Sequence, residues 1–315
     1  MRYQPLPVKY VEPIYRPPSE AGSLILQVTI GCSNLLTRPD PASATGYRVR
    51  RGCAFCVAYQ TKPFRARPRA EVLEEIDRVA VVAPDVRRIF LADGDAVVLG
   101  TPRLLDVLER LTRRFPRLER VTAYAAPRNL LKKSVDDLRR LREAGLTMVY
   151  LGIESGDAEV LERIDKRSTA EQMIEGCLKA KAAGIALSLT VILGLGGPDR
   201  SRRHAEATAE VINRINPEYA AALTLMVEPR VPSFEQVFGD PGFRVLEVPE
   251  ALAECRHLIA HLDTDGTELR SNHASNWLAL KGRLNRDRER LLTTIDEVLG
   301  DPDSPRLRPD YWRAL

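Results

Sequence analysis

The chain alternates short apolar runs with longer amphipathic stretches, and this alternation constrains its fold more than any other feature. Six runs have the length and the β-branched or apolar content of strands; they cover residues 24–30, 88–92, 120–125, 148–153, 187–193 and 221–226. Between them lie stretches with helical periodicity, at about 69–82, 102–114, 134–144, 170–183 and 199–215. This order is typical of βα units around a parallel sheet. We therefore expect an α/β fold, a partial (β/α)6 barrel of the TIM type, with a doubly wound open sheet as the alternative.

Capping residues and glycines support the predicted helix boundaries. Thr101, Ser134 and Thr169 stand near helix starts, where a side-chain oxygen can accept a bond from a free backbone N–H. Gly145 and Gly184 stand where two helices should end. These local signals agree with the periodicity of the stretches they bound.

The regular alternation stops after residue 226. A segment with two prolines leads into a predicted helix at 248–262, an extended piece at 266–271 and a long charged helix at 280–298. We expect three parts in the chain. They are an N-terminal extension (1–23), the barrel (24–226) and a C-terminal, α-rich extension packed on the barrel (227–315).

Composition narrows the class of protein. Of the 315 residues, 44% are hydrophobic and 29% are charged, an ordinary globular balance. The first ten residues have no apolar signal-peptide core, and no apolar run approaches the length of a membrane span, so we expect a cytoplasmic protein. The formal net charge of +4 does not by itself imply a nucleic-acid partner.

Cysteines are concentrated near the start of the chain. Three of the five, Cys32, Cys53 and Cys56, precede residue 57, and the odd count argues against a disulfide framework and for metal ligands. Cys177 and Cys255 fall in predicted helices, where we expect buried thiols. Six arginines flank the segment and form either a solvated basic loop or an anion-binding site; they are Arg48, Arg50, Arg51, Arg65, Arg67 and Arg69.

Polar or glycine-rich elements follow four of the predicted strands. They are Cys32, Asp93-Gly94-Asp95, Glu154-Ser155-Gly156 and Gly194-Leu195-Gly196-Gly197. Barrel enzymes place their chemistry on loops after the strand C-termini, so we expect these elements on one rim. An iron-sulfur cluster held by only three thiolates leaves one iron open to a small chelating molecule.

Cys53-Ala-Phe-Cys56, Asp93-Gly-Asp95, Val149-Tyr-Leu-Gly-Ile-Glu-Ser-Gly156 and Val191-Ile-Leu-Gly194 together resemble the radical S-adenosylmethionine (SAM) enzymes over residues 24–230. The resemblance is strongest to the elongator-like, oxygen-independent coproporphyrinogen oxidase-like branch. It implies a 4Fe-4S cluster on Cys32, Cys53 and Cys56, with SAM on the unique iron and flavodoxin or ferredoxin as electron donor. It further implies reductive cleavage of SAM to a 5'-deoxyadenosyl radical that abstracts hydrogen from a substrate.

The resemblance also implies a set of SAM contacts. Asp93, Gly94 and Asp95 would meet the SAM amino group, through backbone carbonyls and an aspartate. Glu154, assisted by Ser155, would accept bonds from the ribose hydroxyls, and Lys166 would approach the methionine carboxylate. Leu193 would flank the adenine, and Phe55 would shield the cluster or the adenine edge. Taken as residues alone, these positions also fit structural roles, such as a turn, a helix-start acid, a solvated lysine, a buried strand and a core aromatic.

The cysteine spacing departs from the family's usual C-x3-C-x2-C, because 20 residues separate Cys32 from Cys53. In one interpretation Cys32 is the first ligand and residues 33–52 form a loop-like insertion in the cluster-binding turn. Loop-closure entropy grows slowly with length, so the insertion adds only roughly 1.5–2 kcal/mol. In the other interpretation Cys32 is a bystander and Cys177 or a non-cysteine residue replaces it. We favour the first, because Cys32 ends the first strand, where the family places its first cysteine.

Further polar residues are candidates for contact with the substrate. We consider Tyr59 and His273 for catalysis, and Asn272, His273, Glu228 and Arg230 for substrate binding, although a lone histidine is more often structural. We expect a small-molecule substrate, with RNA or protein modification as the alternative. A non-catalytic metal or RNA-binding protein is a further alternative, but zinc would need a fourth ligand and none follows Cys56 at short spacing.

Overall fold

The computed structural model describes residues 6–39, 41–42, 47–59, 61–227 and 242–314. The chain divides into two compact units. Unit 1 contains Met1–Gly52, Ala58–Leu151 and Glu175–Leu187, and unit 2 contains Cys53–Val57, Gly152–Ile174 and Ser188–Leu315. Each unit is an α/β structure with parallel strands, as the alternation of strands and helices predicted.

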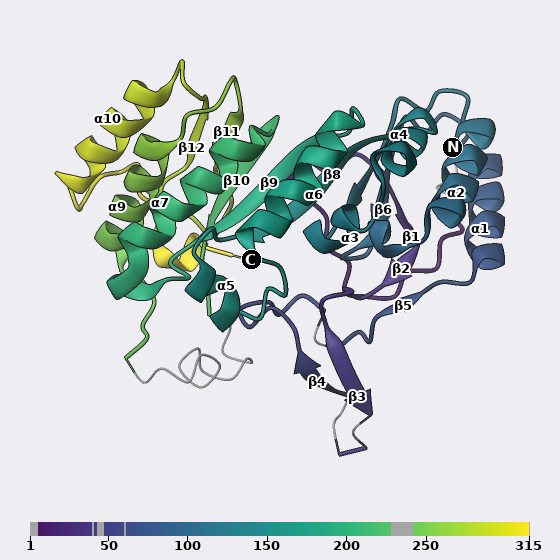
Figure 1. Ribbon diagram of the computed structural model, residues 1–315, viewed down its shortest axis with the longest axis horizontal. Helices are drawn as coiled ribbons and strands as arrows, with labels where there is room; N and C mark the ends of the chain where they lie inside the picture. The colour runs from purple at the N-terminus through teal and green to yellow at the C-terminus, as the bar shows by residue number, and fades with distance from the viewer. Residues whose placement is uncertain (1–5, 40, 43–46, 60, 228–241, 315) are drawn as a thin grey trace. The chain divides into compact units, whose positions relative to one another are not determined.

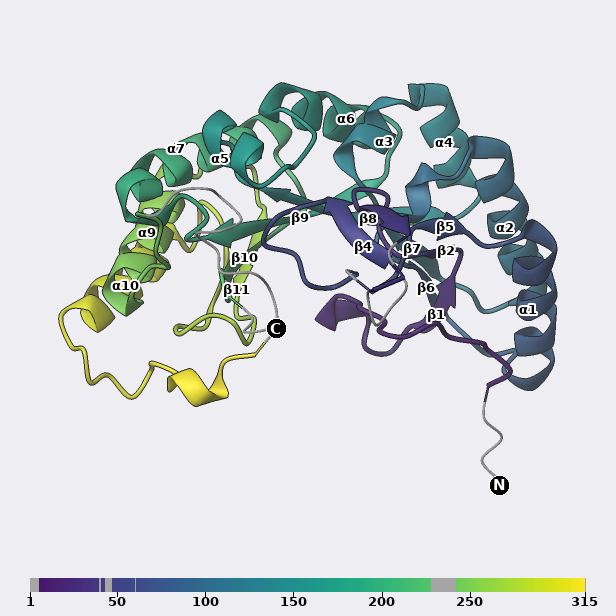
Figure 2. The same ribbon diagram turned by 90° about the horizontal axis from the view of Figure 1, so that it is seen from below.

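Unit 1 is built on parallel strands in the order β1-β6-β7-β8. Their bounds are β1 Leu24–Gln27, β6 Arg88–Ala92, β7 Arg120–Tyr124 and β8 Leu146–Glu154, whose last residues belong to unit 2. The outer helices are α1 Arg69–Val82, α2 Thr101–Arg114 and α4 Val135–Glu143, and they lie along one side of these strands (Figure 2). Ile89, Phe90 and Leu91 of β6 have no exposed surface, so β6 lies in the core of the unit.

Unit 2 continues the βα pattern with β9, β10 and β11 and adds an antiparallel strand, β12. The bounds are β9 Ala186–Leu193, β10 Tyr219–Thr224, β11 Glu268–Ser271 and β12 Leu280–Arg283. Its helices are α5 Ala158–Arg163, α7 Gly197–Ile215, α9 Val248–His261 and α10 Arg288–Leu299. Helix α7 packs against α9, and α9 packs against α10 (Figure 1). Because β11 pairs with β10, the C-terminal part of the chain extends the sheet of this unit.

Smaller elements complete the chain. They are β2 Thr29–Ile30, which pairs with β5 Arg65–Ala66, the helix α6 Ala170–Ala182, the short helix α3 Pro127–Leu131, and the 3-10 turns η1 Pro18–Glu20, η2 Ala96–Val98 and η3 Asp310–Trp312. The segment 33–52 contains an antiparallel hairpin, β3 Leu36–Pro39 and β4 Tyr47–Arg51 (Figure 1). The sequence predicts a loop with a short extended second half here. The loop is wrong for the first half, because Leu36–Pro39 is a strand, and β4 confirms the extended second half.

Several predicted boundaries agree with the structure. Helix α1 has the predicted bounds, Ser134 caps α4 by accepting a bond from Asp137 N, and Gly145 and Gly184 follow helices with φ of +116° and +79°. Thr101 is wrong as a cap, because Gly100 holds that position and Thr101 lies buried in the first turn of α2. Among the described residues, no helix combines the length and apolar character needed to cross a bilayer.

Two predicted elements differ from the structure. The strand at 24–30 is divided, because β1 ends at Gln27 and Thr29–Ile30 turns to pair with β5. The charged helix predicted at 280–298 is wrong before residue 288, because Leu280–Arg283 pairs with β11 and α10 begins only at Arg288. In β12 buried Leu280 and Gly282 alternate with exposed Lys281 and Arg283, which is the period of a strand and not of a helix.

Candidate functional site

Cys53 and Cys56 lie on a tight turn in unit 2. The backbone N–H of Cys56 donates to the carbonyl of Cys53 over 2.9 Å, which closes the turn. The N–H of Ala54 donates to the carbonyl of Ile164, also over 2.9 Å, and attaches the turn to the end of α5. Both cysteines are reduced thiols; they are half-buried, and so is Phe55 between them.

Glu154 occupies an unusual backbone conformation at the C-terminal end of β8. Its φ is +64°, in the left-handed region that residues other than glycine rarely adopt. Gly152 leaves room for its side chain, since a Cβ on Gly152 would lie 1.9 Å from Glu154 Oε1. Lys166 Nζ lies 3.0 Å from the same oxygen, and both side chains are about nine-tenths buried. Strained residues of this kind persist where the surrounding structure requires them, commonly at functional sites.

Ser155 is fully buried in a polar network that the sequence did not reveal. Its hydroxyl donates to His204 Nδ1 over 2.8 Å and accepts from Asp157 N over 2.9 Å. His204 Nε2 lies 3.1 Å from the carbonyl of Ile192, so this nitrogen carries the proton and Nδ1 is the acceptor. The hydroxyl of Ser155 therefore supports the loop after β8, and its predicted assistance to SAM binding stays a prediction.

Glu254, on α9, lies beneath the glycine-rich segment after β9. Gly194 N donates to Glu254 Oε1 over 2.6 Å, and the Ser201 hydroxyl donates to Oε2 over 2.5 Å. Burial raises the pKa of Glu254, against the opposing effects of nearby His204 and these donors. Gly194 itself has a φ of +89°, which requires a residue without a side chain at this bend. Helix α9 thus fixes the backbone that follows Leu193, which is buried at the end of β9.

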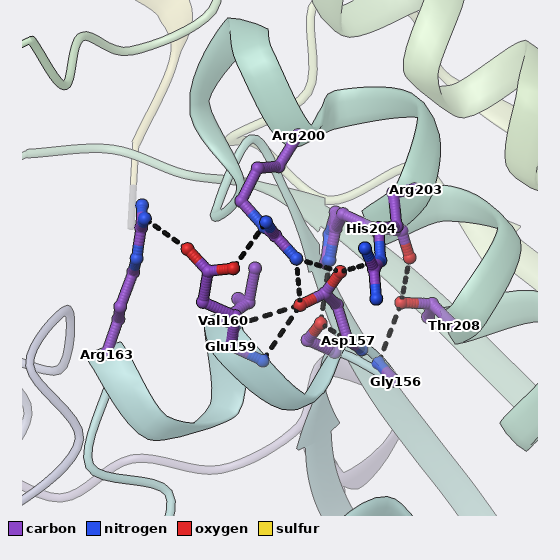
Figure 3. A network of polar contacts seen from close by, with 10 residues as sticks. Gly156, Asp157, Glu159, Val160, Arg163, Arg200, Arg203, His204 and Thr208 are labelled. Carbon is purple, nitrogen blue, oxygen red and sulfur yellow. Dashed lines mark hydrogen bonds and ion pairs between the residues drawn. The ribbon is translucent and has the colours of Figure 1, made fainter.

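Asp157 begins α5 and joins it to α7 (Figure 3). Its carboxylate accepts from the N–H groups of Glu159 and Val160, and Arg200 Nη2 lies 2.9 Å from both of its oxygens. Burial alone would raise the pKa of Asp157, but these donors outweigh it and hold the pKa below its usual range. Gly156 N donates to Thr208 on α7, so the whole turn after Glu154 is tied to that helix (Figure 3).

Asp93 follows β6 in unit 1 and is fully buried. Its Oδ2 accepts from Lys62 Nζ over 2.5 Å and from Gly31 N over 3.0 Å, while its Oδ1 has no hydrogen-bond partner within the described ranges. Burial raises the pKa of Asp93, although the bond from Lys62 acts against it. Sequence reasoning missed Lys62, whose ammonium also donates to the carbonyls of Val11 and Pro13. The sequence offered one signal for Lys62, which is that a lysine stands close to the cysteines in a segment otherwise rich in arginine.

Gly94 packs directly against Cys32 and Tyr59. A Cβ on Gly94 would lie 2.9 Å from Cys32 Cβ and 2.7 Å from the Tyr59 ring, and the Cys32 sulfur lies 3.9 Å from the Gly94 carbonyl oxygen. The first predicted ligand, the candidate Tyr59 and the glycine of the predicted SAM-binding turn therefore meet within unit 1. Only a residue without a side chain fits at position 94.

Asp95 is committed to protein contacts. It accepts from the Ser33 hydroxyl, from Asn129 Nδ2 over 2.5 Å and from Ala126 N over 3.1 Å, and it is fully buried. Burial raises its pKa, and these donors oppose that rise. Ser33 follows Cys32, so the Asp95 side chain positions the loop that carries Cys32. The predicted contact of Asp95 with SAM would therefore involve the backbone of Asp95.

The remaining predicted residues have mixed outcomes. Cys177 and Cys255 are buried, as expected, and burial raises the pKa of each thiol to about 12. Of the flanking arginines, Arg67 does not belong to a solvated or anion-binding loop, because it is buried in an ion pair with Glu75. Glu228 and Arg230 lie outside the described residues.

His273 and Asn272 belong to a loop held by the C-terminal tail. Arg308 donates to the carbonyls of both residues, and His273 Nδ1 lies 3.0 Å from the Ser275 hydroxyl. Burial and nearby Arg308 lower the pKa of His273, which favours the neutral imidazole. Asn272 is exposed.

Residues 48–212, just over half of the chain, match the Radical SAM superfamily. The chain belongs to this superfamily. The enzymes of this superfamily use a 4Fe-4S cluster and SAM as cofactors, and they need an electron donor and a substrate. The non-catalytic alternative is thereby removed. The match begins after Cys32, so that cysteine does not contribute to it.

Two curated relatives are similar to this chain over more than half of its length. The heme chaperone HemW of Bacillus subtilis (strain 168) is 23% identical over 184 residues, which cover 56% of this chain and 48% of HemW. A tRNA-2-methylthio-N(6)-dimethylallyladenosine synthase of Roseobacter denitrificans is 22% identical over 222 residues, covering 68% and 48% of the two chains. The chain thus spans about half the length of these curated relatives.

Similarity to a solved radical SAM structure confirms the expected fold. Coproporphyrinogen III oxidase (HemN) from Escherichia coli superposes with a TM-score of 0.55 at 15% identity, over 76% of this chain and 51% of HemN. At this identity the likeness concerns the fold alone. The fold is the partial TIM-type barrel of these enzymes.

The residues of each unit fit the cofactors of the superfamily. In unit 2 a turn presents two reduced cysteines, and a buried carboxylate and ammonium are held at the end of a strand. In unit 1 a third reduced cysteine packs on a glycine whose neighbour, Asp93, keeps one buried oxygen without a partner in the described structure. Thiolates suit iron, and an unpaired acceptor suits an ammonium group such as that of SAM.

Proposed function

We propose that this enzyme cleaves SAM reductively at a cluster held by Cys32, Cys53 and Cys56, and abstracts hydrogen from a small-molecule substrate. When bound, the reduced cluster supplies the electron that breaks a carbon-sulfur bond of SAM. The chain's own part is to hold the three thiolates, to orient SAM and to exclude water from the reacting groups. We take reduced flavodoxin or ferredoxin as the electron donor.

A single contact carries the proposal. The bond from Ala54 N to Ile164 O attaches the Cys53–Cys56 turn to the segment that ends in Lys166, and Lys166 pairs with Glu154. Within unit 2 the two cysteines are therefore linked, through one short segment, to the buried acid and base assigned to SAM. A turn with a purely structural role would need neither the two cysteines nor the strained Glu154 at that place.

Each assigned residue has a chemical task. Glu154 accepts bonds from the ribose hydroxyls, and Lys166 neutralises that carboxylate and attracts the methionine carboxylate of SAM. In unit 1, Asp93 Oδ1 and the carbonyl of Gly94 are the acceptors for the SAM ammonium group. Leu193 and Phe55 supply apolar surface for the adenine and the cluster.

The substrate is assigned more coarsely. His273 has a lowered pKa, which favours the neutral imidazole, and its Nδ1 accepts from Ser275 N over 3.1 Å, so its Nε2–H can donate to a substrate oxygen. Its loop is fixed by Arg308 and Ser275, which gives the imidazole a defined direction. A small polar molecule is the class that such a site suits.

The test is anaerobic reconstitution followed by assay with dithionite. We expect a brown protein with about four irons per chain and formation of 5'-deoxyadenosine from SAM. The Cys53→Ala variant should lose both the iron and the product. Formation of a different SAM-derived product would contradict the assigned carbon-sulfur bond, and a colourless protein without SAM turnover would contradict the whole proposal.

A second candidate is modification of RNA. It is favoured by the relative from Roseobacter denitrificans, which by its name acts on tRNA. The two candidates separate in a tRNA-binding assay at two salt concentrations, because phosphate contacts weaken steeply with salt. Salt-dependent, submicromolar binding would favour RNA, and its absence would favour the small molecule.

A further inference from the structure

Helices α7 and α9 bring three potential metal ligands together on the surface of unit 2. Glu206 lies on α7, and His257 and His261 lie one turn apart on α9. One ligand atom from each of the three residues lies within 4.8 Å of the other two. Two of the chain's four histidines are in this group, which has no part in the site described above.

The geometry of the two histidines suits the binding of one metal ion by both. Residues four apart project from the same face of a helix, and the two ring centroids are 4.3 Å apart. His261 Nδ1 lies 2.8 Å from the carbonyl of His257 and donates to it, so Nε2 carries the lone pair. A ligating histidine typically donates its other ring N–H to a carbonyl in this way, which fixes the orientation of the ring.

Glu206 completes a mixed nitrogen and oxygen set. Its Oε1 lies 2.8 Å from His257 Nε2. Arg202 Nε also lies 3.1 Å from the same oxygen. The Arg202 side chain is 80% exposed, so it can leave the oxygen for solvent at little cost.

We propose that Glu206, His257 and His261 bind a divalent transition-metal ion of the zinc class. Zinc takes imidazole nitrogen and carboxylate oxygen at about 2.0–2.2 Å, which places neighbouring ligands roughly 3.3 Å apart in a tetrahedral shell. The present separations need only small side-chain movements to reach that value. Three protein ligands leave a fourth position for water, and the bound ion cross-links α7 to α9.

The site differs in chemistry from the cysteines near the start of the chain. Zinc also binds thiolates, so empty Cys32, Cys53 and Cys56 would compete for it. Cys177 and Cys255 do not compete, because burial holds both thiols protonated at neutral pH. The experiment therefore uses protein whose 4Fe-4S cluster has been reconstituted.

The test is zinc binding to cluster-loaded protein, measured anaerobically by competition with a chromophoric chelator. We expect one zinc ion per chain. His257→Ala and Glu206→Gln should weaken binding by at least about tenfold, since each removes a direct ligand. Glu210→Gln, one turn further along α7, is the matched control and should bind zinc like the unchanged chain.

A second readout separates the site from adventitious binding. Zinc should raise the Tm of the unchanged chain and of Glu210→Gln, but not that of His257→Ala, because only a bound ion links the helices. The proposal is overturned if the loaded protein binds no zinc, or if all variants bind zinc with equal affinity. Equal affinity would assign the ion to other groups.

Discussion

Replacing Gly152 by alanine should move the Glu154 carboxylate without unfolding the protein. The added Cβ would lie 1.9 Å from Glu154 Oε1, about 1.5 Å closer than the 3.4 Å at which ordinary contact begins. The carboxylate must move away by a similar distance, and this breaks its 3.0 Å contact with Lys166. The clash is with the end of a flexible side chain, so the backbone of β8 need not shift.

The expected effects on binding and stability differ. If Glu154 accepts bonds from the SAM ribose, their loss costs roughly 1.5–3 kcal/mol, so SAM should bind roughly 10- to 100-fold more weakly. The free energy of unfolding should change by no more than about 1 kcal/mol, because alanine also restricts the unfolded chain. The assay is equilibrium dialysis of SAM against cluster-loaded protein, with urea unfolding alongside.

Two variants make this prediction decisive. Gly300→Ala is the control in the same unit, since its Cβ would make only ordinary contacts, the closest at 3.5 Å. Glu154→Gln keeps the shape and removes the charge, and it should weaken SAM binding in the same direction. Unchanged SAM affinity in Gly152→Ala and in Glu154→Gln would refute the assignment of Glu154.

Three other outcomes are expected. Gly94→Ala should lower the iron content after reconstitution, because its Cβ would lie 2.9 Å from Cys32 Cβ; full iron loading would show that this contact does not matter. Gly156→Ala should destabilise the chain by about 1–3 kcal/mol in urea unfolding, since its Cβ would lie 2.0 Å from the Ala207 carbonyl oxygen and the backbone cannot yield cheaply. The pKa of Glu254 is raised in the folded chain, so the folded state binds a proton at this carboxyl more tightly than the unfolded state does. The stability that this protonation contributes is present below pH 4.5 and is lost as the pH rises through the raised pKa. Glu254→Gln should therefore reduce the fall in stability with pH above 4.5, and an unchanged pH profile would contradict the raised pKa.

The order of strands and helices was predictable, because each βα unit carries its own period and end signals. Helix α1 and the cap at Ser134 show that local chemistry sufficed there. The division of residues 24–30 was not predictable, because Thr29–Ile30 pairs with Arg65–Ala66, more than thirty residues away. The strand at 280–283 was not predictable either, because only its pairing with β11 distinguishes it from the start of a helix.

The residues proposed to meet the cofactors could be named from the sequence, whereas the residues that support their loops could not. Cys53 and Cys56 stand in a recognisable C-x2-C motif, and Glu154 stands in a recognisable motif at the end of a strand. His204 on α7 supports Ser155, and Glu254 on α9 supports Gly194. No local pattern marks a histidine or a glutamate within a helix as a partner of a distant loop. Such supports become visible only through tertiary packing.

The role of Cys32 is the central claim, because it decides how a cluster can form across an interval of 20 residues. The most direct test is to measure iron and 5'-deoxyadenosine in Cys32→Ala beside Cys177→Ala, both reconstituted anaerobically. Cys177 is a buried neutral thiol and serves as the control. We expect Cys177→Ala to keep about four irons and SAM cleavage while Cys32→Ala loses both. A full, SAM-cleaving cluster in Cys32→Ala would contradict the account.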